Sequence, residues 1–224
     1  MSASPAQAAR YRDIYRRLHA HFGHRDWWPG DDPFGIMVGA VLTQNTAWKN
    51  VIRAIANLEA ADALNPEAIL ANPFETVAQW LKPSGYFNVK TKRLRAYCAW
   101  YLEQGSFEAL RDWDTEALRA GLLGVHGVGP ETADDILLYA FERPVFVIDA
   151  YTRRAFARLG LVGGKEDYET LRAGFERALG PDVALFNDYH AQIVGLGHFF
   201  CRPRPLCADC PVSEICDYAR QNDA

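Results

Sequence analysis

The chain has 224 residues, of which 49% are apolar and 23% charged, and its formal net charge is −4. This length permits one large or two small domains, and the composition excludes a disordered, collagen-like or generally polybasic chain. No apolar run reaches the roughly 18 residues of a membrane span, and the N-terminus lacks the pattern of a signal peptide. We therefore expect a soluble, cytoplasmic protein with no membrane partner.

Apolar residues recur at helical spacing through most of the chain, beginning with 10–22, where Tyr11, Ile14 and Leu18 share one face. The run after Pro33 is apolar on nearly all sides, as in a helix buried at the centre of a bundle. Further helices are expected over 46–58, 66–70, 73–81, 89–104, a short segment after residue 114, 130–141, 151–159, 168–179 and 186–200. The segment 145–148 is the one good strand candidate, too short to build a sheet. The pattern predicts an all-α protein of about ten short helices.

Four of the five cysteines lie close together near the C-terminus, unlike a disulfide framework spread over a whole chain. Their spacing, C-x5-C-x2-C-x5-C, places in one loop the four thiolates that complete a zinc site or hold a 4Fe-4S cluster. Only one pair is short, which favours iron-sulfur over zinc, and unligated or disulfide-bonded cysteines are the third alternative. The candidate ligands are Cys201, Cys207, Cys210 and Cys216. Cys98, on an apolar helical face, is expected to be a core residue.

A glycine-rich turn at 124–129 separates two of the predicted helices. Gly127 and Gly129 would leave backbone N–H groups bare at a helix N-terminus, where a phosphate can bind. Small Ala133 would let the two helices approach closely. A tight turn between helices needs no ligand, however, so a purely structural role for the glycines stays open.

Asp149 follows the apolar segment 145–148 and precedes the helix expected at 151–159. An aspartate at this position is a good N-cap, and this structural role would account for Asp149 without any catalytic function. The helix dipole would also keep the carboxylate ionised, and a fixed carboxylate facing a pocket could stabilise an oxocarbenium-like sugar cation and orient a water. Both roles remain possible on the sequence alone.

In this order and at these separations, the hairpin 125–137, Asp149, Arg154 and the cysteine array resemble the helix-hairpin-helix DNA glycosylases of the endonuclease III superfamily. The resemblance spans about 33–216. It implies a six-helix domain at 27–142 and a second helical domain, made of 1–26 and 143–224, that carries the 4Fe-4S loop. The partner would be double-stranded DNA with a damaged or mismatched base, bound by a monomer associated with the nucleoid.

The resemblance also implies roles for single residues. Asp149 would be the catalytic carboxylate. Gln44, in LTQNTAWKN, would fill the space left by a flipped base, and Tyr86, at a glycine-led turn, would be a wedge. Without the rest of the pattern, these two would pass for a helix-end polar residue and a half-buried aromatic. The residues implied in DNA binding are Gln44, Tyr86, Gly127, Gly129 and Arg154.

The sequence looks closest to the branch that includes bacterial 3-methyladenine glycosylases. Strand-cutting members of the superfamily carry a lysine where this chain has Glu131, and a carboxylate cannot form an imine. The resemblance therefore implies hydrolytic removal of alkylated purines such as 3-methyladenine without lyase activity, unless Lys90 or Lys92 substitutes. An aromatic pocket could select these cationic bases. Candidates for it are Trp27, Trp28, Trp48 and Glu131.

Two features keep alternatives open. The first cysteine gap is one residue shorter than the family's usual six, and a pI near 5.9 weighs against strong nonspecific DNA binding. Local basic groups at 90–95, 153–158 and 202–204 lead us to expect weak, salt-sensitive binding to undamaged duplex. The alternatives are a glycosylase for mismatched thymine or uracil, for adenine opposite an oxidised guanine or for oxidised pyrimidines, with or without lyase activity, and a non-catalytic iron-sulfur DNA-binding protein.

Overall fold

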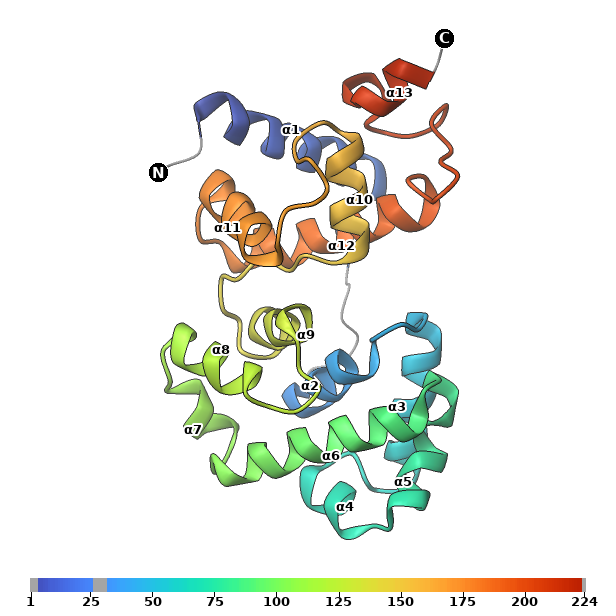
Figure 1. Cartoon of the computed structure of the whole chain (residues 1–224), viewed down its shortest axis with the longest axis vertical. Coiled ribbons are helices and arrows are strands. Elements are labelled where there is room, and N and C mark those ends of the chain that lie inside the picture. Colours follow the sequence, from blue (N-terminus) through green and yellow to red (C-terminus); the bar gives the residue numbers. More distant parts are fainter. Residues whose placement is uncertain (1–3, 26–31, 223–224) are drawn as a thin grey trace. The chain divides into compact units, whose positions relative to one another are not determined.

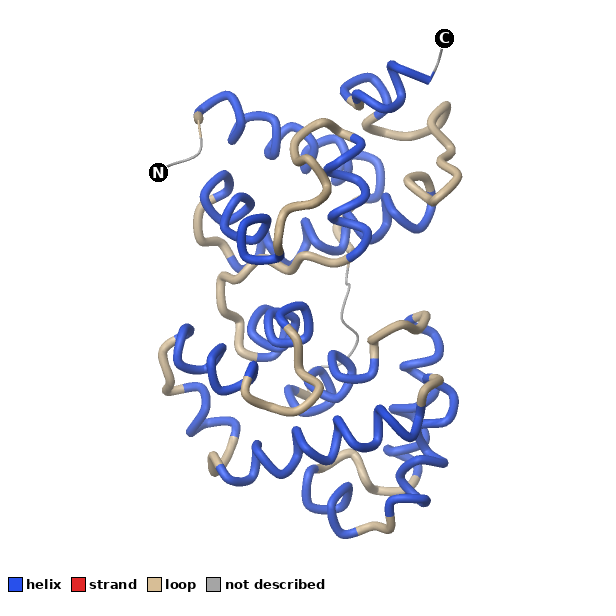
Figure 2. The backbone as a smooth tube through the Cα atoms, in the orientation of Figure 1, coloured by secondary structure: helices blue, strands red, loops and turns tan. Residues whose placement is uncertain are grey.

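A computed structural model describes residues 4–25 and 32–222 of the chain. Across these residues the regular structure is entirely helical and contains no strand, which confirms the all-α class (Figure 2). None of their helices is both long and apolar enough to cross a membrane. The chain divides into two compact units, Gly30–Arg143 and the combination of Met1–Pro29 with Pro144–Ala224.

The continuous unit, Gly30–Arg143, is built around α2 and α6 (Figure 1). Its helices are α2 (Pro33–Leu42), α3 (Trp48–Ala60), α4 (Pro66–Ala71), α5 (Phe74–Leu81), α6 (Phe87–Glu103), α7 (Phe107–Arg111), α8 (Thr115–Leu123) and α9 (Pro130–Asp135). As predicted, α2 is buried on nearly all sides, with Met37, Val38 and Leu42 fully inaccessible. α6 packs against α2, α4 and α5 and runs from the Tyr86 turn to the other end of the unit.

The second unit joins the N-terminal helix to the C-terminal third of the chain. It contains α1 (Pro5–Phe22), α10 (Ala150–Arg158), α11 (Tyr168–Leu179), α12 (Val183–Phe199) and α13 (Asp217–Asn222). α1 packs against α11 and α12, and α10 packs against α12 and α13. Aromatic rings fill its core: Phe146 stacks on Phe175 with centroids 4.2 Å apart, and Tyr11 meets Phe175 edge-on at 4.8 Å.

Several helix ends differ from the sequence prediction because caps rather than periodicity set them. α1 begins at Pro5 instead of residue 10, since the Ser4 hydroxyl accepts the Gln7 N–H at 3.2 Å and proline suits the first helical turn. α9 ends at Asp135 and continues as a π-helical turn, Ile136–Ala140. The short α7 and α13 were not predicted, because so few turns show no clear apolar period.

The strand candidate at 145–148 is wrong. The segment is buried but has no regular secondary structure, and no strand lies beside it among the described residues. Side chains satisfy its backbone instead: the Phe146 N–H donates to Glu176 Oε1 at 3.0 Å, and the Ile148 N–H donates to the Tyr168 hydroxyl at 3.3 Å. A buried backbone donor needs a partner of some kind, and here two groups on α11 supply it. This segment leads directly into Asp149.

Candidate active site and DNA-contacting residues

Asp149 caps α10, as its position suggested. Its Oδ1 accepts the backbone N–H and the hydroxyl of Thr152, both at 2.7 Å. Its other oxygen, Oδ2, lies 3.7 Å from Nε2 of His190 on α12, an ion-pair distance longer than a good hydrogen bond. The side chain of Asp149 is only 12% exposed. The cap therefore uses one carboxylate oxygen and leaves the second for an interaction of another kind.

Opposing effects act on the pKa of Asp149. Burial is the largest and raises this pKa, but the nearby His190 imidazole, together with the Thr152 donors, lowers it by more. The net pKa is below its usual value, so Asp149 is an ionised carboxylate at neutral pH. A carboxylate held in place and partly shielded from water is suited to stabilising a nearby cation.

The glycine turn links α8 to α9 in the continuous unit. Gly127 has φ +89°, and a Cβ added there would lie 2.2 Å from Cγ of Arg93, so the turn itself requires this glycine. Gly129 has φ −97°, and a Cβ added there would meet nothing within 4 Å. The fold therefore requires glycine at position 127, whereas packing imposes no such requirement at position 129.

Gln44 contacts the same turn. Its side-chain Nε2 donates to the Gly127 carbonyl at 3.0 Å and to the Thr132 hydroxyl at 3.1 Å. Its Oε1 accepts a hydrogen bond from the Arg93 guanidinium on α6. The amide nitrogen of Gln44 therefore holds it to the hairpin, and the amide oxygen holds it to α6.

Tyr86 is the most exposed large apolar side chain among the described residues, at 72%. It precedes α6 in the left-handed conformation, with φ 45°, directly after Gly85 at φ 69°. Lys90, in contrast, is buried at 1% exposure, and its Nζ donates to the Ser84 carbonyl at 2.6 Å. Lys90 is thus poorly placed to act as a nucleophile.

Most basic residues that the sequence placed near DNA donate to backbone carbonyls within their own unit. Arg95 contacts the carbonyls at the end of α4, and Arg154 Nε donates to the Cys201 carbonyl at 2.7 Å. Arg153, Arg158 and Arg202 behave in the same way. Lys92 is exposed. These guanidinium groups already donate to carbonyls of the protein itself. Fewer of them are therefore available to bind DNA phosphates than the sequence alone suggests.

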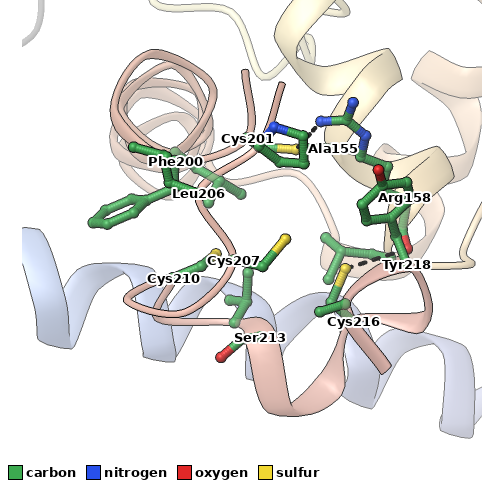
Figure 3. A pocket seen from close by; sticks show the side chains of 15 residues that line it. Ala155, Arg158, Phe200, Cys201, Leu206, Cys207, Cys210, Ser213, Cys216 and Tyr218 are labelled. Carbon is green, nitrogen blue, oxygen red and sulfur yellow. Dashed lines mark hydrogen bonds between the residues drawn. The ribbon is translucent and has the colours of Figure 1, made fainter. Parts of the chain in front are cut away.

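The four C-terminal cysteines line one pocket (Figure 3). Arg158 Nη1 donates to Cys201 Sγ at 3.3 Å, and Cys216 Sγ lies 3.3 Å from the Arg158 carbonyl. Burial, with the other three sulfurs nearby, raises the pKa of Cys210 to about 11. No three His, Cys, Asp or Glu side chains in the described part of the chain are arranged to hold a metal ion.

The remaining candidates are less closely connected. Trp48 begins α3 and is half-buried, and Glu131 is exposed in the first turn of α9. Trp27 and Trp28 lie outside the described residues. Cys98 is fully buried, as expected for a core residue, and burial raises its pKa to about 12.

Comparison with known proteins identifies the family. Residues 38–181 match the HhH-GPD superfamily of base excision DNA repair proteins. The chain belongs to this superfamily. A Methanocaldococcus jannaschii protein named "Putative DNA repair glycosylase" is 45% identical over 206 residues, which cover 91% of this chain and 94% of that protein.

Solved structures agree with this assignment. The 3-methyladenine DNA glycosylase MagIII of H. pylori, bound to 1,N6-ethenoadenine, has a TM-score of 0.71 and 30% identity, over 82% of this chain and 95% of that one. A non-covalent endonuclease III–DNA complex has a TM-score of 0.82 at 18% identity, over 96% and 98% of the two chains, and shows the shared fold. The resemblance to the endonuclease III superfamily is confirmed, and the chain is a DNA repair glycosylase of the HhH-GPD superfamily.

Sequence reasoning did not predict three contacts at these positions. His190 lies beside Asp149, Arg93 contacts Gln44, and Lys90 holds the carbonyl before the Tyr86 turn. The partners of His190 and Arg93 are more than 40 residues away in the chain, so no local spacing could reveal those two contacts. The sequence analysis instead placed Lys90 in a basic group near DNA and among the possible lyase residues.

Proposed function

We propose that this glycosylase hydrolyses the N-glycosidic bond of alkylated purines, such as 3-methyladenine, with Asp149 as the catalytic carboxylate. The observation that carries this proposal is a buried, ionised Asp149 whose Oδ1 is used by the cap of α10 while Oδ2 is not. As the C1′–N bond breaks, the sugar acquires positive charge that Oδ2 would stabilise; water then attacks C1′ and releases a proton to solvent. The departing base carries away the bonding electron pair, and a cationic alkylated base leaves as a neutral one.

The substrate class is supported by the 30% identity to a 3-methyladenine glycosylase. Alkylated purines carry positive charge and a weakened glycosidic bond, so an aromatic pocket could select them with modest catalysis. Trp48 would contribute to that pocket, together with Trp27, Trp28 and Glu131. Gln44 and Tyr86 would enter the duplex where the base leaves the stack.

Absence of lyase activity is the second part of the proposal. Glu131 cannot form an imine, and Lys90 has a buried Nζ that donates to a carbonyl at 2.6 Å. Lys92 is exposed and is therefore the residue to replace if a covalent adduct is ever trapped.

We also propose that Cys201, Cys207, Cys210 and Cys216 hold a 4Fe-4S cluster. The four side chains line one pocket, and Arg158 donates to one of the sulfurs, as suits a thiolate ligand. The spacing, with Cys207 and Cys210 as its one short pair, supports an iron-sulfur cluster over zinc. The cluster would tie the ends of the loop together, and Arg154 and Arg158 already attach this loop to α10.

The deciding experiment is a single-turnover assay on duplexes with 3-methyladenine, uracil, mismatched thymine or an oxidised base, each analysed with and without alkali. We expect base release from the alkylated duplex and strand breaks only after alkali. Breaks without alkali, or a borohydride-trapped adduct, would show lyase activity. Release of a base from a different duplex would identify that base as the substrate instead. Release from none of the duplexes would favour a non-catalytic DNA-binding protein.

The two hairpin glycines provide a further prediction. Gly129→Ala should leave stability within about 0.5 kcal/mol of wild type, because the added methyl meets no protein atom, but it should weaken binding to DNA by obstructing the approach of a phosphate. Gly127→Ala should destabilise the fold by more than about 1 kcal/mol, because it clashes with Arg93. Thermal unfolding and affinity for an abasic-site duplex measure the two effects. Unchanged affinity of Gly129→Ala would refute its phosphate role.

His190 provides a prediction about pH. His190→Gln keeps a polar side chain but removes the imidazole whose interaction with Asp149 lowers the pKa of that carboxyl, so the pKa of Asp149 should rise. Because only the ionised form stabilises a cation, the acid limb of the single-turnover rate should move to higher pH. Rates for wild type and variant on one duplex, measured across the acidic range, test this. Superimposable profiles would mean that His190 does not act through Asp149.

A further inference from the structure

Lys90 contacts both ends of the turn that carries Tyr86. Its Nζ donates to the Ser84 carbonyl at 2.6 Å, before the turn, and its backbone N–H donates to the Tyr86 carbonyl at 3.0 Å, after it. Ser84 is fully buried, and its hydroxyl donates to the Leu81 carbonyl at 2.7 Å. Lys90 thus connects α6 to the carbonyl group that precedes Gly85 and Tyr86.

The turn needs such support because its backbone conformation is unfavourable. Gly85 and Tyr86 both have positive φ, 69° and 45°. A tyrosine in the left-handed region costs free energy, which contacts around it must offset. The Tyr86 side chain contributes little to this, because it is 72% exposed.

Burying the ammonium is itself unfavourable. Burial, with the positive charge of Arg93 one turn away on α6, lowers the pKa of Lys90 from 10.5 to about 8. An apolar side chain of similar length would fill the same space without that cost. What the ammonium adds is a strong hydrogen bond to the Ser84 carbonyl.

α6 therefore contacts both side chains that the proposed function sends into the duplex. Arg93 binds the amide oxygen of Gln44, and Lys90 holds the turn of Tyr86. We propose that Lys90 is a positioning residue for base flipping, whose ammonium fixes the turn 84–86 so that Tyr86 meets the duplex in one conformation. This inference rests on the proposed role of Tyr86 in the duplex.

The first test measures the turn without DNA. Lys90→Met should increase amide hydrogen exchange at 84–87, whereas Lys92→Met, which removes the same charge from an exposed position two residues along α6, should not. Equal exchange in the two variants would overturn the proposal. This readout is independent of activity, so it still reports on Lys90 if no duplex proves to be a substrate. Lys90→Gln, whose shorter side chain cannot span the same distance, is the second variant if Lys90→Met does not fold.

The second test is a double-mutant cycle on base release. Lys90→Met should slow the single-turnover rate on the duplex that wild type cleaves by about 10- to 100-fold, as expected when a contacting group is misplaced. In a Tyr86→Ala background, Lys90→Met should add almost nothing, because the side chain that it positions is gone. An unchanged rate for Lys90→Met, or equal slowing with and without Tyr86, would overturn the proposal. If wild type itself releases no base, it is the proposed function that fails.

Discussion

Asp149→Asn is expected to lower the single-turnover rate of base release by on the order of 10²- to 10³-fold while the protein stays folded. The two roles of Asp149 separate cleanly in this variant. An asparagine Oδ1 can still accept the N–H and hydroxyl of Thr152, and Asn is as good an N-cap as Asp. The negative charge, however, is lost, and with it the stabilisation of the sugar cation. The measurement is base release under enzyme excess, beside thermal unfolding.

Asp149→Ala is the matched comparison. It removes the cap as well as the charge, so it should lose about 1 kcal/mol of stability in addition to the rate. If Asp149→Asn retained wild-type activity, Asp149 would be a cap and nothing more, and another group would have to stabilise the cation. If it unfolded, the charge interaction with His190, 3.7 Å away, would be structural rather than catalytic.

Asp134→Asn is expected to lower the free energy of unfolding by about 3–5 kcal/mol. Asp134 on α9 accepts two hydrogen bonds from Arg119 on α8, at 2.7 and 3.2 Å, so this pair joins the two helices of the hairpin. The side chain of Asp134 is 0% exposed and that of Arg119 is 8% exposed. Asp134→Asn would remove the negative charge from the group that binds the buried Arg119 guanidinium through two hydrogen bonds. Urea unfolding measures the loss.

Two controls sharpen this prediction. The exposed Asp13–Arg16 pair on α1 has the same 2.7 Å separation with side chains 31% and 73% exposed, so Asp13→Asn should change stability little. Replacing both buried partners, as in Arg119→Met with Asp134→Leu, should recover part of the loss because no isolated charge remains. A loss for Asp134→Asn as small as that for Asp13→Asn would show that water screens the buried pair.

Much of the fold could be predicted because its signals are local. The bounds of α11 match the expected 168–179, and its N-cap Asp167 accepts the N–H of Thr170, three residues along. The all-round burial of α2 follows from its composition, and the position of Asp149 as a cap follows from the helix after it. Cysteine spacing likewise placed the four side chains in one loop, and they line one pocket.

The tertiary structure alone decided how individual side chains are used. The segment 145–148 has strand-like residues, but its backbone donors find side chains of α11. Lys90 and Lys92 are two residues apart, yet one is buried and the other exposed. Caps and apolar periods depend on residues within a turn or two, which the sequence displays directly. Burial, ion pairing and hydrogen bonding to a distant carbonyl depend on which helices meet, and packing of the whole unit determines that.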